Sequence, residues 1–281
     1  MDSNHQERPK QFYEAAYSDS GKGSYGGDST DETWVCRINS QKQITTDWLR
    51  RLGVRFEADE PVLELGCGLA YLADVHPGYI GLEFSSTAVA RVGGSTSKIR
   101  IQQGDMQNIP FEDESIAALF TWAAMEHVPN PGTALKEIMR VLKPGGGAIV
   151  APAWHCRPWT VKKLEIRPYS ELRIFEKMEK ALIPIRGNLA WRTVCQIPGR
   201  LYREGLLLLG VKVGLSYRTL SPVWELNRRY PHIADDDALA SIDMHSAICF
   251  FQSRGWLVLS HASALARVTC RSGALVVKKP L

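Results

Sequence analysis

One carboxylate and two glycines in the first third of the chain have the types and spacing of a nucleoside-binding site. Gly66 and Gly68 follow the apolar run 62–65, where a buried parallel strand would enter a tight turn. Glycine lets the backbone bend sharply there and lets a ligand come close. A second apolar run, 79–82, ends in Glu83, and an acid at the end of the second strand of a β-loop-α-β unit usually holds a ribose diol. This stretch therefore predicts a site for a nucleoside-type cofactor.

The spacing of the glycines separates two cofactor classes. A nicotinamide-binding turn has Gly-x-Gly-x-x-Gly, but Tyr71 stands where the third glycine belongs. The segment after the turn is short and helix-compatible, so we expect its free N–H groups to face the turn. An acid inside the first strand is also unusual for a dinucleotide site. Together these residues resemble the first motif, E-x-G-x-G-x-G, of the Rossmann-like S-adenosylmethionine-dependent methyltransferases, with alanine in place of the last glycine: Glu64, Gly66, Cys67, Gly68 and Ala70.

Further segments extend this resemblance over about residues 60–153. Gly104-Asp105-Met106 follows an expected third strand at 99–102. In the family, an acid at this point accepts a hydrogen bond from the adenine amino group, and Met106 would lie against the base. The segments EHVPNP and LKEIMRVLKPGG are similar in order and spacing to those of small-molecule members. By this resemblance the chain is identified as a class I, small-molecule-type methyltransferase.

The resemblance implies a fold, an enzyme activity and a donor site. We expect an α/β fold with a doubly wound, seven-stranded, mostly parallel sheet and a long, mainly helical insertion after the fifth strand. The implied cofactor is S-adenosylmethionine, with S-adenosylhomocysteine as the product, and no metal is expected. The residues expected to bind the cofactor are Glu64, Gly66, Cys67, Gly68, Glu83, Phe84, Asp105, Met106, Thr121 and Trp122.

Methyl transfer to oxygen or nitrogen requires a positioned acceptor and often a base. The donor is already activated, so positioning supplies most of the rate, on the order of 7–11 kcal/mol. A base helps when the acceptor proton must leave, and histidine suits that role near neutral pH. His127 follows the fourth expected strand, His155 follows the fifth, and His245 begins a late helix. These three histidines are the candidate catalytic residues, and catalysis without a base remains an alternative.

The remaining elements are expected to build the frame around these residues. The expected strands are 62–65, 79–82, 99–102, 115–120, 148–151 and 256–260, followed by an antiparallel pair at 265–270 and 274–278. The expected helices are 7–17, 31–52, 85–92, 131–141, 170–181, 199–210 and 241–254. The predicted division is 1–55 for N-terminal helices and a loop, 56–153 for the donor-binding core, 154–240 for a basic helical insertion over the acceptor, and 241–281 for the last helix and strands. The glycine-rich loop at 18–30 is either a lid or a linker.

Composition indicates an ordinary globular protein. The chain has 281 residues, of which 44% are hydrophobic and 23% are charged. We expect no signal peptide at the polar N-terminus, and the longest apolar run, 205–211, is too short to span a bilayer. Six scattered cysteines without a C-x-x-C pair favour reduced thiols. A cytoplasmic location is therefore predicted.

Charge is unevenly distributed and bears on the acceptor. Residues 156–232 contain 15 Lys and Arg against 6 Glu, a net charge of +9, and the rest of the chain carries −5. With interleaved aromatic residues this favours an anionic or glycosylated small-molecule acceptor, as in secondary metabolism. A nucleic-acid substrate is disfavoured, because residues 121–124 are Thr-Trp-Ala-Ala where amino-directed nucleic-acid methyltransferases carry an Asn/Asp-Pro-Pro-aromatic tetrad.

Three alternatives remain open. The leucines at 206–209, flanked by basic residues, could contact a membrane surface as a peripheral interaction. A nucleic-acid methyltransferase and a catalytically silent methyltransferase-like binding module are the alternative functions. The sequence does not predict the oligomeric state.

Overall fold

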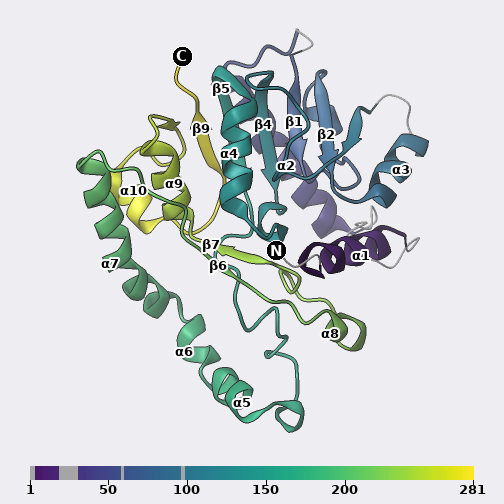
Figure 1. The fold of residues 1–281 in the computed structure, drawn as a ribbon, viewed down its shortest axis with the longest axis vertical. Coiled ribbons are helices and arrows are strands. Elements are labelled where there is room, and N and C mark those ends of the chain that lie inside the picture. The colour runs from purple at the N-terminus through teal and green to yellow at the C-terminus, as the bar shows by residue number, and fades with distance from the viewer. Residues whose placement is uncertain (1–3, 19–30, 58–59, 96–98) are drawn as a thin grey trace. The chain divides into compact units, whose positions relative to one another are not determined.

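The computed structural model describes residues 4–18, 31–57, 60–95 and 99–281 (Figure 1). Their contacts divide the chain into two units. The core unit consists of Met1–Met125, Pro129–Pro152 and Ala274–Leu281. The second unit consists of Glu126–Val128 and Ala153–Gly273. Of the loop predicted at 18–30 as a lid or linker, Ser18 ends the first helix and residues 19–30 lie outside the described residues.

The strands confirm the predicted α/β class and the seven-stranded, mostly parallel sheet. Their order is β3-β2-β1-β4-β5-β9-β8. The pairs of β1, β2, β3, β4 and β5 are parallel, and β9 pairs antiparallel with β5. The bounds are β1 Val62–Leu65, β2 Tyr79–Glu83, β3 Ile101–Gln103, β4 Ile116–Trp122, β5 Leu142–Ala151, β8 Leu257–Val258 and β9 Leu275–Lys278.

The centre of the sheet is the hydrophobic core of the core unit. Every residue of β1 is buried, and Val62, Leu63 and Leu65 are fully enclosed. A strand covered on both faces reads as a continuous apolar run, which is why β1 was legible in the sequence. In register, Leu65 lies beside Leu82 of β2, and Glu64 lies beside Phe120 of β4. The acid of β1 is therefore enclosed by strands on both sides.

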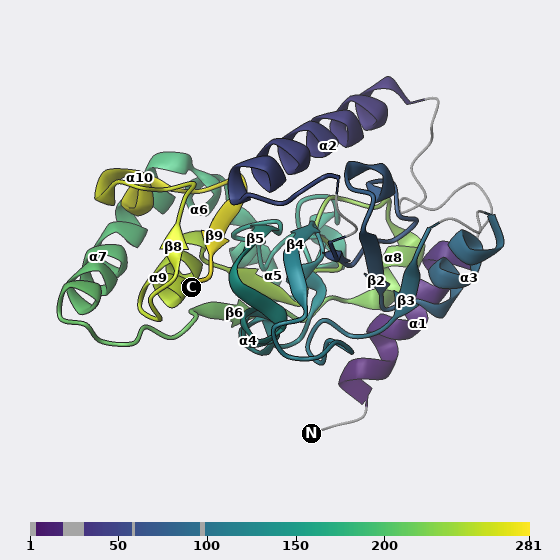
Figure 2. The same cartoon turned by 90° about the horizontal axis from the view of Figure 1, so that it is seen from above.

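Helices cover both faces of these strands. The helices of the core unit are α1 Asn4–Ser18, α2 Glu32–Leu52, α3 Ser86–Ser95 and α4 Pro131–Val141. Figures 1 and 2 show α2 and α4 on opposite faces of β4 and β5. Asp31 begins α2 by accepting hydrogen bonds from the backbone N–H groups of Thr33 and Trp34, as an N-cap residue does. The bounds of α2 and α4 agree closely with the prediction.

The second unit is mainly helical and has a small sheet of its own. It contains a 3-10 helix η3 Tyr169–Glu171, α5 Ile174–Ala181, α6 Ile183–Gly187, α7 Leu189–Leu208, β6 Tyr217–Thr219, α8 Trp224–Arg229, β7 Ala240–Ile242, α9 Met244–Gln252 and α10 Ala264–Thr269. Strands β6 and β7 pair antiparallel. The helices α5, α6 and α7 follow one another along the chain, and α7 lies beside α9 and α10 (Figure 1). The predicted helical character of the insertion is confirmed.

Three predicted elements were wrong in type or extent. Residues 265–270, predicted as a strand, form α10, because the hydroxyl of Ser263 accepts a hydrogen bond from the N–H of Ala266 and caps a helix there. The strand predicted at 256–260 is only the two-residue β8. The helix predicted from 241 begins at Met244 after an Asp243 N-cap, and residues 240–242 pair with β6 instead.

Candidate functional site

The glycine turn after β1 has the backbone that only glycine adopts easily. Gly66 has φ +70° and Gly68 has φ +54°, both in the left-handed region. The N–H groups of Gly66 and Cys67 donate to the carbonyl oxygen of Leu82 at 2.8 and 3.2 Å. The segment that follows contains only the 3-10 helix η1 Ala73–Val75. The helix-compatible segment after the turn thus forms only a short 3-10 helix, and the N–H groups of the turn itself bond to β2.

Little room exists for a side chain at either glycine. A Cβ at Gly66 would lie 2.4 Å from the Cβ of Ala124 and 3.6 Å from the Cε of Met106. A Cβ at Gly68 would lie 2.9 Å from the hydroxyl oxygen of Tyr17. The turn is thus a cradle that a methyl group would fill. Met106 lies beside this turn, and its contact with the adenine base stays a prediction.

Glu83 ties the end of β2 to the glycine turn. Its Oε2 accepts a hydrogen bond from the N–H of Gly68, and its Oε1 accepts one from the N–H of Ser85, both at 2.9 Å. Burial raises the pKa of Glu83, although these backbone donors favour the charged form. The predicted acid therefore lies directly against the predicted turn. Phe84 stands between Glu83 and Ser85, and its carbonyl oxygen accepts a hydrogen bond from the side-chain amide of Gln103 at 3.3 Å.

Glu64 lies inside the sheet and accepts a hydrogen bond from Tyr79. The Tyr79 hydroxyl lies 2.5 Å from Glu64 Oε2. Burial raises the pKa of Glu64 to about 8, against the hydrogen bond from Tyr79 and with help from the charge of Glu83. Burial also raises the pKa of the Cys67 thiol, whose sulfur faces Gly81. Glu64 is therefore neutral at pH 7 in the structure, and Cys67 contributes its backbone to the turn.

The remaining predicted donor residues lie along the ends of β3 and β4. Asp105 accepts hydrogen bonds from the backbone N–H and the side-chain amide of Gln107, so it caps its own turn. Thr121 is fully buried, and its hydroxyl has no hydrogen-bond partner within the described part of the chain. The indole N–H of Trp122 donates to the hydroxyl of Thr45 in α2 at 3.0 Å. Their assignment as cofactor-binding residues stays a prediction.

Sequence reasoning missed two residues of α1 that belong to this region. Glu14 accepts hydrogen bonds from the hydroxyls of Ser85 and Ser86 and from the N–H groups of Ser86 and Thr87, at the start of α3. Despite partial burial, these donors lower its pKa to about 2. Tyr17 is buried with its hydroxyl at Gly68. An acid that caps a helix distant in sequence leaves no local pattern, so only the structure reveals it.

His127 lies among carboxylates in the second unit. Its Nδ1 is 3.3 Å from Asp237 Oδ2, and its Nε2 is 3.7 Å from Glu126 Oε1. Burial disfavours its charged form, but the charges of Asp237, Glu126 and Asp235 outweigh burial and raise the pKa of His127. A raised pKa favours the protonated imidazole, which cannot accept a further proton.

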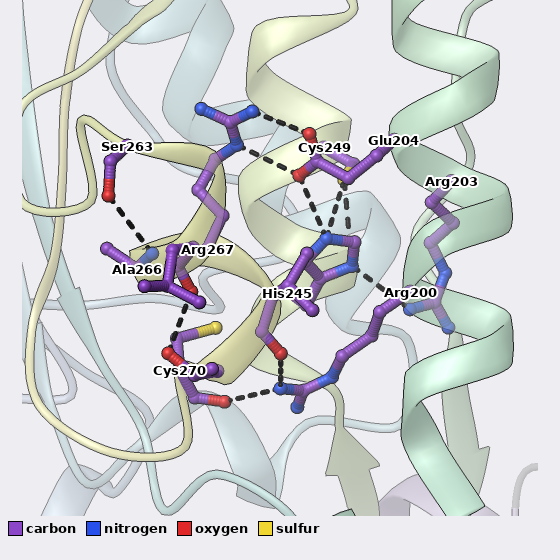
Figure 3. Close-up of polar contacts among 12 residues, drawn as sticks. Arg200, Arg203, Glu204, His245, Cys249, Ser263, Ala266, Arg267 and Cys270 are labelled. Carbon is purple, nitrogen blue, oxygen red and sulfur yellow. Dashed lines mark hydrogen bonds and ion pairs between the residues drawn. The ribbon is translucent and has the colours of Figure 1, made fainter. Parts of the chain in front are cut away.

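His245 is enclosed by side chains of α7 and α9 (Figure 3). Its Nε2 lies 3.1 Å from Glu204 Oε1, its Nδ1 lies 3.3 Å from an Arg203 nitrogen, and the sulfur of Cys249 lies 3.7 Å from both ring nitrogens. Since arginine only donates, Nδ1 is the acceptor and Nε2–H donates to Glu204. Arg267 donates to both oxygens of Glu204. The side chain is fully buried, with both nitrogens engaged.

Glu204, His245 and Cys249 have the side-chain types of a metal site, with ligand atoms within 4.8 Å of one another. Arg267 and Arg203 bring positive charge directly against two of the three. The structure thus accounts for the polar contacts of this cluster through arginines.

His155 has the opposite surroundings to His127. It has φ +61°, a strained value for histidine, and its N–H donates to the carbonyl oxygen of Ile242 in β7 at 3.0 Å. Its side chain is 9% exposed, and Nε2 has no hydrogen-bond partner among the described residues. Burial, opposed by Asp243 and aided by nearby arginines, lowers the pKa of His155 to about 4. Its imidazole is therefore neutral at pH 7.

A family model described as a methyltransferase domain matches residues 63–150. The match spans β1 to β5 and includes the glycine turn and Glu83. Residues 63–150 therefore carry the similarity to methyltransferases, and the match agrees with the class I, S-adenosylmethionine-dependent type that the sequence motifs predicted.

Curated relatives support the same family over part of their length. The chain is 32% identical over 114 residues to a probable S-adenosylmethionine-dependent methyltransferase of Mycolicibacterium smegmatis. This alignment covers 37% of this chain and 44% of the relative. The chain is 36% identical over 95 residues to a demethylmenaquinone methyltransferase of Staphylococcus haemolyticus. That alignment covers 30% of this chain and 39% of the relative. The chain thus spans less than half the length of these two relatives.

Among solved structures, the S-adenosylmethionine-bound amino pentose methyltransferase CalS10 of Micromonospora echinaspora has a TM-score of 0.37 at 22% identity, covering 51% of this chain and 57% of its own.

Among the described residues, no helix is long and apolar enough to cross a membrane.

Proposed function

We propose that the protein transfers a methyl group from S-adenosylmethionine to an oxygen or nitrogen atom of a small-molecule acceptor. One observation carries this proposal: the Gly66–Gly68 turn is tied to Glu83 inside the matched methyltransferase domain. An acid at the end of β2 beside a glycine turn is the arrangement that holds a ribose diol in sites of this topology.

The residues of the core unit fit the donor. The turn presents left-handed glycine backbone without side chains, Met106 offers an apolar surface beside it, and the buried hydroxyl of Thr121 has no hydrogen-bond partner in the described chain. Glu83 would hold the ribose hydroxyls, and Asp105 would accept from the adenine amino group if its bonds to Gln107 open. When bound, S-adenosylmethionine supplies an electrophilic methyl group on a positively charged sulfur.

His155 is the candidate base that its own surroundings favour. Its Nε2 has no hydrogen-bond partner among the described residues, and its pKa of about 4 leaves the imidazole neutral at pH 7. The raised pKa of His127 favours its charged form, and both nitrogens of His245 are engaged. In the proposed step, the acceptor lone pair forms the new bond to the methyl carbon and the carbon–sulfur bond breaks. A base takes the proton that the acceptor loses, S-adenosylhomocysteine leaves, and His155 is the histidine proposed for that role.

Other parts of the proposal rest on sequence. The division of the chain at residues 55, 153 and 240, the cover over the acceptor by residues 154–240 and the cytoplasmic location stay predictions. Against a nucleic-acid substrate, Thr121-Trp122-Ala123-Ala124 still replaces the tetrad of amino-directed nucleic-acid methyltransferases. Against a silent binding module, the glycine turn and both of its acids are intact.

Calorimetric titration with S-adenosylhomocysteine tests the donor assignment, with NAD as the parallel ligand. We expect micromolar binding of the first and no binding of the second. Gly68→Ala places a Cβ 2.9 Å from the Tyr17 hydroxyl at a left-handed position and should weaken binding at least tenfold. Gly93→Ala is the matched control, because its Cβ would meet nothing within 4 Å. Binding of neither ligand by the wild type would favour the silent-module alternative.

A further inference from the structure

A pocket of about 260 Å³ lies entirely within the second unit. Its walls come from residues 155–159, from α6 and α7, and from the hairpin of β6 and β7. The pocket is small and open, so it suits a small organic molecule better than a folded macromolecule. The composition of its walls indicates what that molecule is.

Four arginines line this pocket: Arg157, Arg186, Arg192 and Arg218. Among the described residues, the guanidinium groups of Arg192 and Arg218 make no hydrogen bond or ion pair. Arg157 lies 3.9 Å from Glu165 and Arg186 lies 3.7 Å from Glu179, distances at which both guanidiniums keep donors for a ligand. Four guanidinium groups with two carboxylate partners leave an excess of positive charge that favours an anion.

Arg192 shows that this positive charge is concentrated. Burial and the like charges of Arg157 and Arg271 lower the pKa of Arg192. Arg271 instead donates to the hydroxyl of Thr193 at 2.7 Å. An anion in the pocket would relieve the repulsion among these groups.

Two tryptophans give the pocket flat apolar surfaces. Trp159 is buried, with the guanidiniums of Arg157 and Arg186 at 5.9 and 5.1 Å from its ring. Trp191 is 53% exposed and makes no ring contact with any described residue. An exposed indole beside unpaired guanidiniums favours a ligand with a planar part next to its charge.

His155 is an independent sign of a ligand at this pocket. His155 lines the pocket, and its buried Nε2 has no hydrogen-bond partner among the described residues, since Asp243 Oδ1 lies beyond hydrogen-bond distance at 3.8 Å. A buried nitrogen left without a hydrogen bond destabilises the fold, so a ligand that pairs with it would recover that free energy. The strained backbone of His155 is also typical of functional residues.

We propose that this pocket binds a planar organic anion that bears a phosphate or carboxylate group. Arg192 and Arg218 bind the anionic group, Trp191 covers the planar part, and a polar atom of the ligand pairs with His155 Nε2. This anion site goes beyond the proposed function and does not depend on it.

Calorimetry with four small probes tests the chemistry of the pocket: phenyl phosphate, benzoate, inorganic phosphate and phenol. We expect phenyl phosphate or benzoate to bind at least tenfold more tightly than phenol and than inorganic phosphate. Whichever of the two planar anions binds better identifies the charged group as phosphate or carboxylate. Equal binding of phenol and the planar anions, or no binding of any probe, would overturn the proposal.

Paired variants separate the pocket from general surface charge. Arg192→Gln/Arg218→Gln should weaken binding of the better planar anion at least tenfold. Lys177→Gln/Lys212→Gln removes the same charge from exposed positions that do not line the pocket, and it should bind normally. Thermal melts establish that all variants are folded. Equal losses in the two double variants would refute a specific site.

Cys195 provides a second readout that requires no variant of the pocket. It is exposed and lines the pocket, and Cys36 is exposed elsewhere. Phenyl phosphate or benzoate should slow alkylation of Cys195 by iodoacetamide severalfold and leave Cys36 unaffected, as measured by peptide mass spectrometry. Unchanged alkylation of Cys195 at saturating anion would contradict binding in this pocket.

The titration with S-adenosylhomocysteine separates failure of this proposal from failure of the proposed function. Normal donor binding together with no anion binding removes only the pocket. Anion binding without donor binding removes the methyltransferase and keeps the pocket as an anion site. His155→Ala should weaken binding of the better planar anion severalfold, and unchanged binding would remove His155 from the anion site.

Discussion

Replacing Glu64 by glutamine should remove a large pH dependence of stability. Burial raises the pKa of Glu64 from 4.5 to about 8, so the folded protein binds a proton that the unfolded chain has released. The unfolding free energy must therefore fall as pH rises from the unfolded pKa to the folded pKa. In this window the folded protein has to take up a proton from an increasingly dilute supply, whereas the unfolded chain does not. Glutamine keeps an acceptor for the Tyr79 hydroxyl and cannot ionise.

The size of the effect follows from the shift. Each pKa unit corresponds to about 1.4 kcal/mol, so this single group should cost the wild type about 2.5 kcal/mol of unfolding free energy between about pH 5 and about pH 7. Glu64→Gln should lack this loss. At neutral pH the variant should therefore be more stable than the wild type, unless its amide fits the site poorly.

Urea denaturation of both proteins at half-unit steps between about pH 5 and about pH 8 measures the difference. The informative quantity is the change with pH of the gap between the two curves, because every other titrating group is shared. Two parallel curves would refute the neutral, buried Glu64. Titration with S-adenosylhomocysteine at each pH then shows whether the neutral carboxyl matters for the donor site.

Three further expectations concern the frame of the site. Glu14→Ala removes the acceptor of four hydrogen bonds at the start of α3. Urea denaturation should show an unfolding free energy lower by roughly 2 kcal/mol. An unchanged value would mean that α1 does not stabilise α3. The raised pKa of His127 means that its cation stabilises the fold fully below the unfolded pKa of about 6.5 and that this stabilisation is lost as pH rises through the folded pKa. His127→Gln should flatten the stability curve in that window, and an unaltered slope would contradict the ion pairs. Gly147→Ala places a Cβ 2.4 Å from Leu52 Cδ2 and 2.9 Å from the Val277 oxygen, so the melting temperature should fall by several degrees, while Gly93→Ala should not lower it.

The elements that were predicted well are those whose structure is determined by residues adjacent in the sequence. The apolar run of β1 shows burial on both faces, and Asp31 before an amphipathic segment shows the start of α2. Residues 265–270 were mistaken for a strand because short apolar segments fit both periods. The deciding bond, from the N–H of Ala266 to the hydroxyl of Ser263, is a cap that competes with strand pairing.

The part of the candidate site that lies in the first sequence motif was predictable. The pairing of Gly68 with Glu83 follows from the spacing of the two strands, and the structure brings them together. The protonation states of the histidines could not be read from the sequence. They depend on Asp237 near His127 and on Arg203 near His245, and each partner is distant in sequence from its histidine. Glu14 and Tyr17 were missed for the same reason.

Strand β9 has a consequence for synthesis of the chain. It pairs with β5 through Val276 and Val277, so the matched segment 63–150 lacks the neighbour of its own last strand. On the ribosome, the edge of β5 stays open until residues 275–278 have emerged. An unpaired apolar strand edge is a template for aggregation. A stop codon shortly before residue 275 would therefore leave every motif of the donor site in place and still yield a protein prone to aggregate.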